Sequence, residues 1–207
     1  GTVIGFLRGG KNSFFRVITA GYITVIRQTP LLIQLMCWYF VGFLSIRNNS
    51  FLNLSNVVNI SNKGIELFGL NLSSEFSALL FGLSIFSSAF IAEVIRGGIQ
   101  SVPVGQWEAF RSLGISEKQG FIKIIIPQAL PAFIPGLTSQ YLNLAKNSTL
   151  AIAIGYADIY AINDTIINQT GRAVECFIIL LCSFLILNLL ITKVMGIIDK
   201  SIMKTRI

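Results

Sequence analysis

The stretch Ile124–Ala145, IIIPQALPAFIPGLTSQYLNLA, runs for 22 residues without a charged side chain. An α-helix rises about 1.5 Å per residue, so about 20 such residues cross a hydrocarbon core of about 30 Å. Three further uncharged runs of comparable length lie on either side of it, Gln28–Ile46, Phe76–Ala92 and Cys176–Thr192. A mean hydropathy of +0.72 with only 12% charged residues is too apolar for an ordinary soluble domain. The pattern predicts an all-α integral membrane protein, and a soluble protein with buried helices fits it poorly.

Glycines, prolines and small residues set the expected ends and contacts of these helices. Threonine is a favoured N-cap and proline is tolerated at the first helical position, so Thr29-Pro30 predicts a helix start. Pro131 and Pro135 are expected to break the helix that follows residue 127. The small residues of the second span predict close contact with other helices. The expected spans are Pro30–Leu44, Phe76–Ala92, Pro127–Ala145 and Val174–Thr192.

The basic residues gather in alternate connecting segments. Most of them fall within residues 8–27, 93–123 and 193–207, whereas residues 47–75 and about 155–173 hold few. Loops rich in lysine and arginine stay on the cytoplasmic side of a membrane. We therefore expect the three basic segments, and with them the C-terminus, to be cytoplasmic. The net charge of +7 does not indicate a nucleic-acid partner, because no basic face alternates with stacking aromatic residues.

Several kinds of chemistry are not expected. The sequence has no histidine, which is the commonest general base and metal ligand. Its three cysteines, Cys37, Cys176 and Cys182, lie in or beside the uncharged runs without the spacing of a metal site. We therefore predict no catalytic residue, no metal and no cofactor. The first residues, Thr2–Leu7, form an apolar stub that meets Arg8, so we expect a first spanning helix to be missing or truncated.

Residues 47–75 differ from the rest of the chain. Asparagine and serine are frequent there, and apolar and polar residues alternate on both sides of Asn62-Lys63-Gly64. Alternation around a short turn sequence predicts a β-hairpin. This segment is expected to be an external, periplasmic insertion.

Residues 103–127 predict two short helices joined at Gly114. In the first, from about Gly105 to Leu113, Trp107, Phe110 and Leu113 recur at helical spacing and form one apolar stripe. Gly114 is expected to end this helix, and Ser116 to cap the next. A striped helix of this kind inserts into a groove on a partner or lies on the lipid surface. The residues alone leave both readings open.

The same segment resembles the EAA signature of ABC importer permeases. That signature reads Glu-Ala-Ala, three residues, Gly, nine residues and Ile-x-Leu-Pro, and this chain has Glu108-Ala109-Phe110, Gly114 and Ile124-x-Ile126-Pro127. It departs by two apolar replacements, Phe110 for alanine and Ile126 for leucine. Over about 170 residues the chain is similar to the polar amino-acid branch of that family, and within it to the general L-amino-acid permeases. The supporting stretches are 27–35, 91–109 and 126–130 for the branch, and 62–64, 146–156 and 168–175 for the closer group.

The resemblance implies a fold, a function and a set of partners. The fold would be a type I ABC importer permease-like bundle of about five transmembrane helices, in one transmembrane permease domain over residues 1–207. The chain would be a non-catalytic permease subunit of a bacterial inner-membrane importer for polar or general L-amino acids, working by alternating access. Its partners would be a dimer of ATP-binding subunits that binds the ATP-Mg, a second permease, homologous or identical, and a periplasmic amino-acid-binding protein. The residues docking the ATPase would be Trp107, Glu108, Ala109, Phe110, Leu113 and Gly114.

Four polar residues are candidates for the solute pathway. Lys146 ends an uncharged run and is followed by Asn147 and Ser148, and Gln34 lies one turn into the helix expected from Pro30. An ionisable side chain at membrane depth suggests a functional site, and Lys146 would pair with a substrate carboxylate. The other reading of Lys146 is a lysine that extends to the membrane surface. Glu93 and Arg96 are expected to form a pair at the cytoplasmic edge.

Two other functions remain as alternatives. An ion-coupled secondary amino-acid transporter would need carboxylates at mid-membrane depth, and none of the nine acidic residues lies inside a long uncharged run. An intramembrane enzyme would need histidines, metal-spaced cysteines or paired carboxylates within the membrane.

Overall fold

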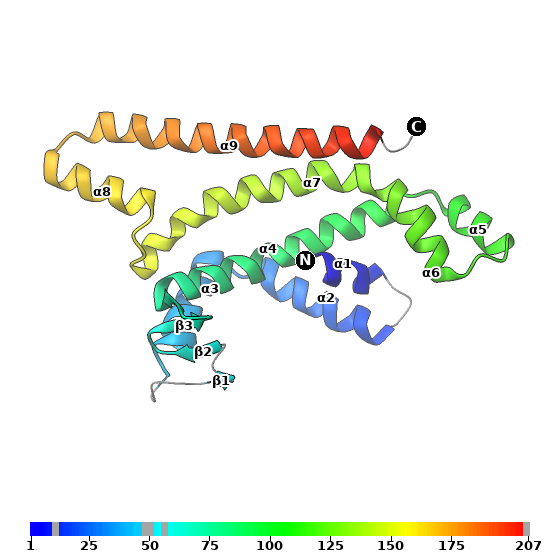
Figure 1. Ribbon diagram of the computed structural model, residues 1–207, viewed down its shortest axis with the longest axis horizontal. Helices are drawn as coiled ribbons and strands as arrows, with labels where there is room; N and C mark the ends of the chain where they lie inside the picture. The colour runs from blue at the N-terminus through cyan, green and yellow to red at the C-terminus, as the bar shows by residue number, and fades with distance from the viewer. Residues whose placement is uncertain (10–12, 47–51, 55–57, 205–207) are drawn as a thin grey trace. The chain divides into compact units, whose positions relative to one another are not determined.

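The computed structural model describes residues 1–9, 13–46, 52–54 and 58–204, which form helices and one small sheet (Figure 1). The chain divides into two compact units, each described by itself below. Unit 1 comprises Gly1–Ile26, Ser87–Asn143 and Asn188–Ile207, and unit 2 comprises Arg27–Phe86 and Leu144–Leu187.

The elements are α1 (Thr2–Gly9), α2 (Ser13–Gln28), α3 (Leu31–Met36), the π-helical η1 (Cys37–Phe43), β1 (Leu52–Leu54), β2 (Val58–Ser61), β3 (Gly64–Leu67), β4 (Leu70–Ser73), α4 (Ser74–Gln100), α5 (Val104–Ser112), α6 (Glu117–Gly120), the π-helical η2 (Phe121–Ile125), α7 (Ile126–Asn147), the 3₁₀-helical η3 (Ser148–Ile154), α8 (Ile159–Thr170) and α9 (Ala173–Lys204).

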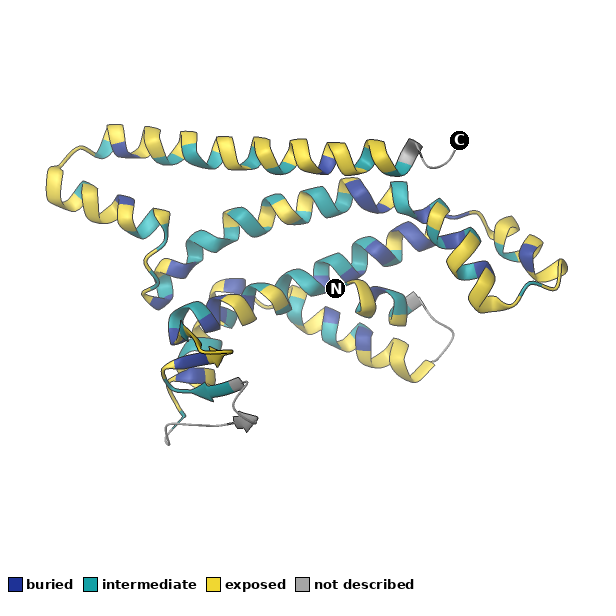
Figure 2. Ribbon diagram, in the orientation of Figure 1, coloured by how far each residue is buried: buried dark blue, intermediate teal, exposed yellow. Residues whose placement is uncertain are grey.

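Among the residues that the structure describes, three helical stretches are long and apolar enough to cross a membrane. They are Ser74–Gln100, Glu117–Ile154 and Ala173–Ile202, where the second combines α6, η2, α7 and η3. Helix α9 exposes apolar side chains along its whole length (Figure 2), with Val174 70% and Leu181 68% exposed. Such a surface is typical of contact with lipid. The all-α membrane architecture is confirmed.

The first expected helix has the predicted bounds to within one residue at each end, but it is not long enough to be a span. The apolar helix runs from Leu31 to Phe43, which is too short to cross a hydrocarbon core in the manner of the other three. Pro30, rather than Thr29, is its N-cap residue, and no side chain caps the helix. Pro30 has an extended backbone with ψ 134°, so the helix begins at Leu31 and Thr29 lies one residue too early to cap it. The Gln34 amide instead donates to the Thr29 hydroxyl at 2.6 Å and to the Thr29 carbonyl at 3.2 Å.

The other spans are longer than their uncharged runs. Helix α4 continues beyond Ala92 to Gln100, and α9 continues beyond Thr192 to Lys204. Charged residues stop the hydrophobic run but not the backbone hydrogen bonding, so a helix can extend out of the membrane. Helix α7 likewise continues through Pro131 and Pro135, which were expected to break it. Each proline removes a single backbone donor, and a continuous membrane helix tolerates this loss.

The core of unit 1 is built from close contact between α4 and α7. A Cβ on Gly98 would overlap the Phe133 ring, and a Cβ on Gly136 would lie 2.6 Å from Val94 Cγ1. Helix α2 packs on α4 through Ile23, which lies against Ala89 and Ala92. Both alanines are fully buried, so the expectation that the small residues of this span face inward is confirmed there. The buried cluster joining α4, α5 and α7 consists of Ile95, Ile99, Val102, Phe110, Ile125, Ala129 and Phe133.

Unit 2 contains the antiparallel sheet, in the order β1-β2-β3-β4 (Figure 1). Strands β2 and β3 form the predicted hairpin, with Ser61 opposite Gly64 across the turn. Gly64 has φ +117°, and the Leu72 carbonyl oxygen occupies the place of a Cβ, so no other residue fits. Strands β3 and β4 turn at Phe68-Gly69, where both residues have positive φ, as a type I′ turn requires.

The helical core of unit 2 lies beside this sheet. Leu31 and Leu35 of α3 pack with Ala151 and Ile154 of η3, and Ile65 of β3 joins the same cluster. Gly82 lets α3 approach α4, because a Cβ there would lie 3.5 Å from Leu35 Cγ and closer still to one of its methyl groups. These contacts bring η3 next to the beginning of the apolar helix at residue 31.

Gly98→Val is expected to lower the melting temperature of the purified protein by several degrees. The added side chain collides with Phe133, and overpacking of this kind costs about 1–3 kcal/mol. Gly97→Val is the matched control, because it adds the same β-branched residue next door in α4, where no atom lies within 4 Å. Thermal unfolding in detergent is the measurement, and equal losses for the two variants would contradict close packing at Gly98.

Candidate functional site

Helices α5 and α6 form a helical loop whose turn is fixed by Gly114. This glycine has φ +70°, a left-handed conformation that costs about 1–2 kcal/mol for other L-residues. The amide of Gly114 donates to the Arg111 carbonyl at 3.0 Å, and the amide of Ile115 donates to the Phe110 carbonyl at 3.0 Å. These two bonds define a Schellman motif, which satisfies the last carbonyls of α5. The predicted role of Gly114 as the end of the helix is confirmed.

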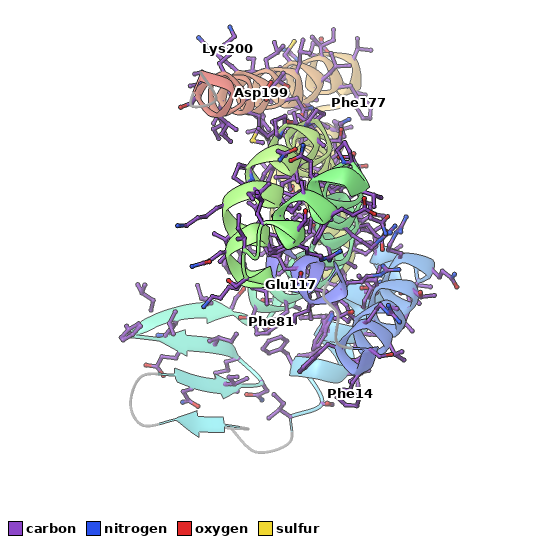
Figure 3. The ribbon with its side chains drawn as sticks, turned by 90° about the vertical axis from the view of Figure 1, so that its right-hand side faces the viewer. Phe14, Phe81, Glu117, Phe177, Asp199 and Lys200 are labelled. Carbon is purple, nitrogen blue, oxygen red and sulfur yellow. The ribbon has the colours of Figure 1, made fainter. Side chains whose placement is uncertain are left out.

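Side chains on both sides of Gly114 tie α5 to α6. The hydroxyl of Ser116 accepts from the Gln119 amide at 3.4 Å and caps α6, as the sequence predicts. Arg111 Nε donates to Glu117 Oε1 at 2.9 Å, which links the end of α5 to the start of α6 (Glu117 is labelled in Figure 3). The Arg111 guanidinium also lies 5.7 Å from the centre of the Trp107 ring. The loop is therefore held as one structural element.

The predicted apolar stripe does not form one exposed surface. Phe110 is only 1% exposed and lies in the cluster that joins α4, α5 and α7. Gly120 makes room for it, because a Cβ at that position would overlap the Phe110 ring. Trp107 is half-buried with its ring 6.0 Å from those of Phe110 and Phe121. Phe110 thus faces the chain's own core, since the start of the α6–η2–α7 stretch folds back over α5.

Residues on the other side of α5 remain accessible. Leu113 is 76% exposed, and Glu108, Ala109 and Gly114 are also exposed. The six residues predicted for ATPase docking therefore divide into a buried anchor, Phe110, a half-buried Trp107, and an exposed set of four. We call these four, Glu108, Ala109, Leu113 and Gly114, the exposed face of α5.

A further polar contact joins the loop to the long helix α7. Gln128 Nε2 donates to Gln106 Oε1 at 3.1 Å, so the first turn of α7 is bonded to α5. Sequence reasoning missed both glutamines and Gly120. The sequence did contain a signal for two of them: Gln128 is a polar residue within a 22-residue uncharged run, and Gly120 is a glycine within a short helical segment.

An ion-pair cluster lies in the same unit. Arg96 Nη2 donates to Glu93 Oε2 at 2.8 Å, one turn away on α4, and this confirms the pair expected from the sequence. The Glu93 carboxylate also pairs with Arg8 of α1, a contact that the sequence did not predict. Glu93 is therefore shared between two guanidinium groups from different helices.

The candidate pathway residues lie in unit 2, on neighbouring elements. Gln34 is on α3 and Ser148 begins η3, and these two elements pack against each other. Lys146 is exposed at the end of α7, and Asn147 is the half-buried N-cap residue of η3. The Ser148 hydroxyl donates to the Ala145 carbonyl at 2.9 Å, where the helix tightens from α to 3₁₀. A seven-residue 3₁₀ segment is unusually long, and such segments often mark functional hinges.

Comparisons with known proteins agree on one family. A family model described as binding-protein-dependent transport system inner membrane component matches residues 1–204. The putative amino-acid ABC transporter permease protein YhdX of Escherichia coli strain K12 is 50% identical over 65% of this chain and 34% of its own length. The general L-amino acid transport system permease protein AapQ of Rhizobium johnstonii is 48% identical over 59% of this chain and 30% of its own length.

A solved structure shares the fold. In the crystal structure of an amino acid ABC transporter with histidines, one chain is 31% identical to this one and superimposes with a TM-score of 0.74. The match covers 96% of this chain and 82% of that chain. By contrast, the alignments with YhdX and AapQ cover about a third of each relative, so the chain spans only part of the length of these two proteins.

Phe110→Ala is expected to loosen the helical loop. Truncating a buried phenylalanine costs about 3–5 kcal/mol, and here the lost contacts are those that hold α5 to the core of unit 1. Amide hydrogen exchange in the purified protein should accelerate over residues 104–120. Leu113→Ala, on the same helix but 76% exposed, should leave the exchange of this segment within twofold of the original. Protection that survives in Phe110→Ala would show that the anchor lies elsewhere.

Proposed function

We propose, because this chain belongs to the family of binding-protein-dependent transport system inner membrane components, that it forms the membrane pathway of an ATP-driven importer. The observation that carries the proposal is the helical loop α5–α6. Its exposed face presents Leu113 to a partner, whereas Phe110 fixes the helix from behind to α4 and α7. This arrangement is suited to transmitting force from a bound protein to the membrane helices.

The mechanical logic follows from how the loop is supported. An ATP-binding subunit that grips the exposed face would push or pull on α5 as it closes around ATP. Because the Phe110 ring and the Gln106–Gln128 hydrogen bond join α5 to α7, the movement would reach α7 rather than be absorbed by the loop. The permease then makes and breaks no covalent bond, and the ATP-Mg is bound and hydrolysed by the partner.

The remaining partners are proposed from the same family. They are a dimer of ATP-binding subunits, a second permease that is homologous or identical, and a periplasmic amino-acid-binding protein. In this arrangement the loop α5–α6 and the C-terminus are cytoplasmic, as the distribution of basic residues predicts. Nothing in the comparisons supports the alternative of an ion-coupled secondary transporter.

L-amino acids are the proposed solutes, because the relatives YhdX and AapQ carry amino-acid transport in their names. We propose that Lys146 pairs with the substrate carboxylate near the start of η3, with Asn147 beside it at the end of α7, Ser148 on η3 and Gln34 on α3, which packs against η3. An irregular helical segment that exposes backbone groups at membrane depth is a common setting for such sites.

Leu113→Asp is expected to reduce co-purification of the ATP-binding subunit at least tenfold and to abolish ATP-dependent uptake. The aspartate places a charge in the centre of an apolar contact, where an unpaired buried charge costs several kcal/mol. Because Leu113 is 76% exposed, the stability of the permease itself should not change. Phe68→Asp is the matched control, since Phe68 is also 76% exposed and lies in the sheet expected outside the cell. Equal ATPase recovery with both variants would rule out docking at Leu113.

Lys146→Met is expected to raise the KM for amino-acid uptake about tenfold or more while leaving ATPase association intact. The methionine keeps most of the side chain's length but removes the cation that would pair with the substrate carboxylate. Lys193→Met, at another exposed lysine, on α9, is the matched control. Uptake should be measured for acidic, neutral and basic amino acids, and unchanged kinetics for all three would remove Lys146 from the pathway.

A further inference from the structure

Three arginines from three different helices line one pocket in unit 1. Arg8 lies in the last turn of α1, Arg16 in the first turn of α2 and Arg96 near the end of α4. The pocket has a volume of about 370 Å³, which is large enough for a phosphate group with its ester substituents. The rest of its wall is formed by Ile99, Gln100, Val102, Val104 and Trp107.

The pocket carries an excess of positive charge. The carboxylate of Glu93 pairs with Arg8 and with Arg96. Within the described part of the chain, no carboxylate pairs with Arg16. Three guanidinium groups facing one carboxylate leave a formal excess of two positive charges. Such a cluster attracts an anion, and guanidinium groups match the oxygen atoms of a phosphate in particular.

Helices α1 and α2, which contribute two of the arginines, expose apolar side chains. On α2 the residues next to Arg16 in sequence are apolar and exposed, with Phe14 68% exposed (Figure 3) and Val17 66% exposed. On α1, Leu7 beside Arg8 is 40% exposed. The three arginines all lie near helix ends, and basic residues at the ends of membrane helices are placed to meet the polar headgroups. A ligand for this place therefore needs an anionic head and an apolar body.

We propose that this pocket binds the phosphate headgroup of an anionic phospholipid from the cytoplasmic leaflet. The phosphate would accept from the guanidinium groups, and the acyl chains would lie along the exposed apolar residues of α1 and α2. Such a lipid links α1, α2 and α4 to α5, because Val104 and Trp107 of α5 form part of the same wall. It therefore adds support to the helical loop through Val104 and Trp107, whether or not that loop docks an ATPase.

The test uses the complete transporter complex, purified in detergent and titrated with phosphatidylglycerol or phosphatidylcholine, with bound lipid counted by native mass spectrometry. Phosphatidylglycerol should bind and phosphatidylcholine should not. Arg16→Gln should weaken phosphatidylglycerol binding about five- to tenfold, since a basic group near an anionic lipid contributes about 1 kcal/mol. Arg16→Lys, which keeps the charge, should retain most of the binding. Lys200→Gln, which removes one charge from α9 instead, should stay within twofold of the original protein.

Other outcomes would overturn the proposal. Equal binding of both lipids, or equal losses in Arg16→Gln and Lys200→Gln, would mean that no specific headgroup site exists. Displacement of the lipid by excess inorganic phosphate would show that the pocket takes free phosphate. If Arg16→Gln released the ATP-binding subunit and kept the lipid, an acidic side chain of that protein would be the occupant.

The melting temperature of Arg16→Gln is the control for folding. If it is unchanged, a folding defect is excluded as the cause of lost lipid binding.

Discussion

The burial of the Phe110 ring beneath Gly120 is the interaction on which the helical loop depends. The ring is one of the few large side chains that are almost completely enclosed, and it reaches residues of α4 and α7. Besides this ring, α5 is held by the Gln106–Gln128 hydrogen bond, by the Arg111–Glu117 ion pair and by the half-buried Trp107, whose ring lies 6.0 Å from that of Phe121. A short helix of nine residues is not stable by itself, so its position must come from packing.

Departures from regular α-helix recur along the membrane segments. The apolar helix at residue 31 becomes π-helical at Cys37, the stretch leading into α7 is π-helical at Phe121–Ile125, and α7 ends in a 3₁₀ segment at Ser148. Each change alters the spacing of the backbone hydrogen bonds and costs free energy, which the packing of neighbouring side chains must offset. Two of them lie next to the helical loop and next to the candidate solute residues, where the proposed transport cycle would require the helices to move.

Much of this architecture could be predicted from local patterns. The glycine at 114, the serine cap at 116 and the hairpin around residue 62 follow from backbone rules that act within a few residues. The helix ends and the candidate site were harder. Thr29 does not cap the helix, because Pro30 is extended and the helix begins one residue later. Phe110 and Leu113 have the same place in the sequence pattern, and only the packing of another element over α5 buries Phe110 and leaves Leu113 exposed.

The sequence by itself determined that this chain enters a membrane, where the hydrophobic runs of its helices lie, and that residues 103–127 form two short helices joined at Gly114. Those properties depend on the hydrophobicity of a run and on the conformational preferences of single residues. Only the tertiary structure decided that Phe110 is an anchor and Leu113 an accessible contact, and that Arg8, Arg16 and Arg96 share one pocket. Such facts depend on which distant segments meet, and a pattern with a period of 3.6 residues cannot say which face a partner will cover.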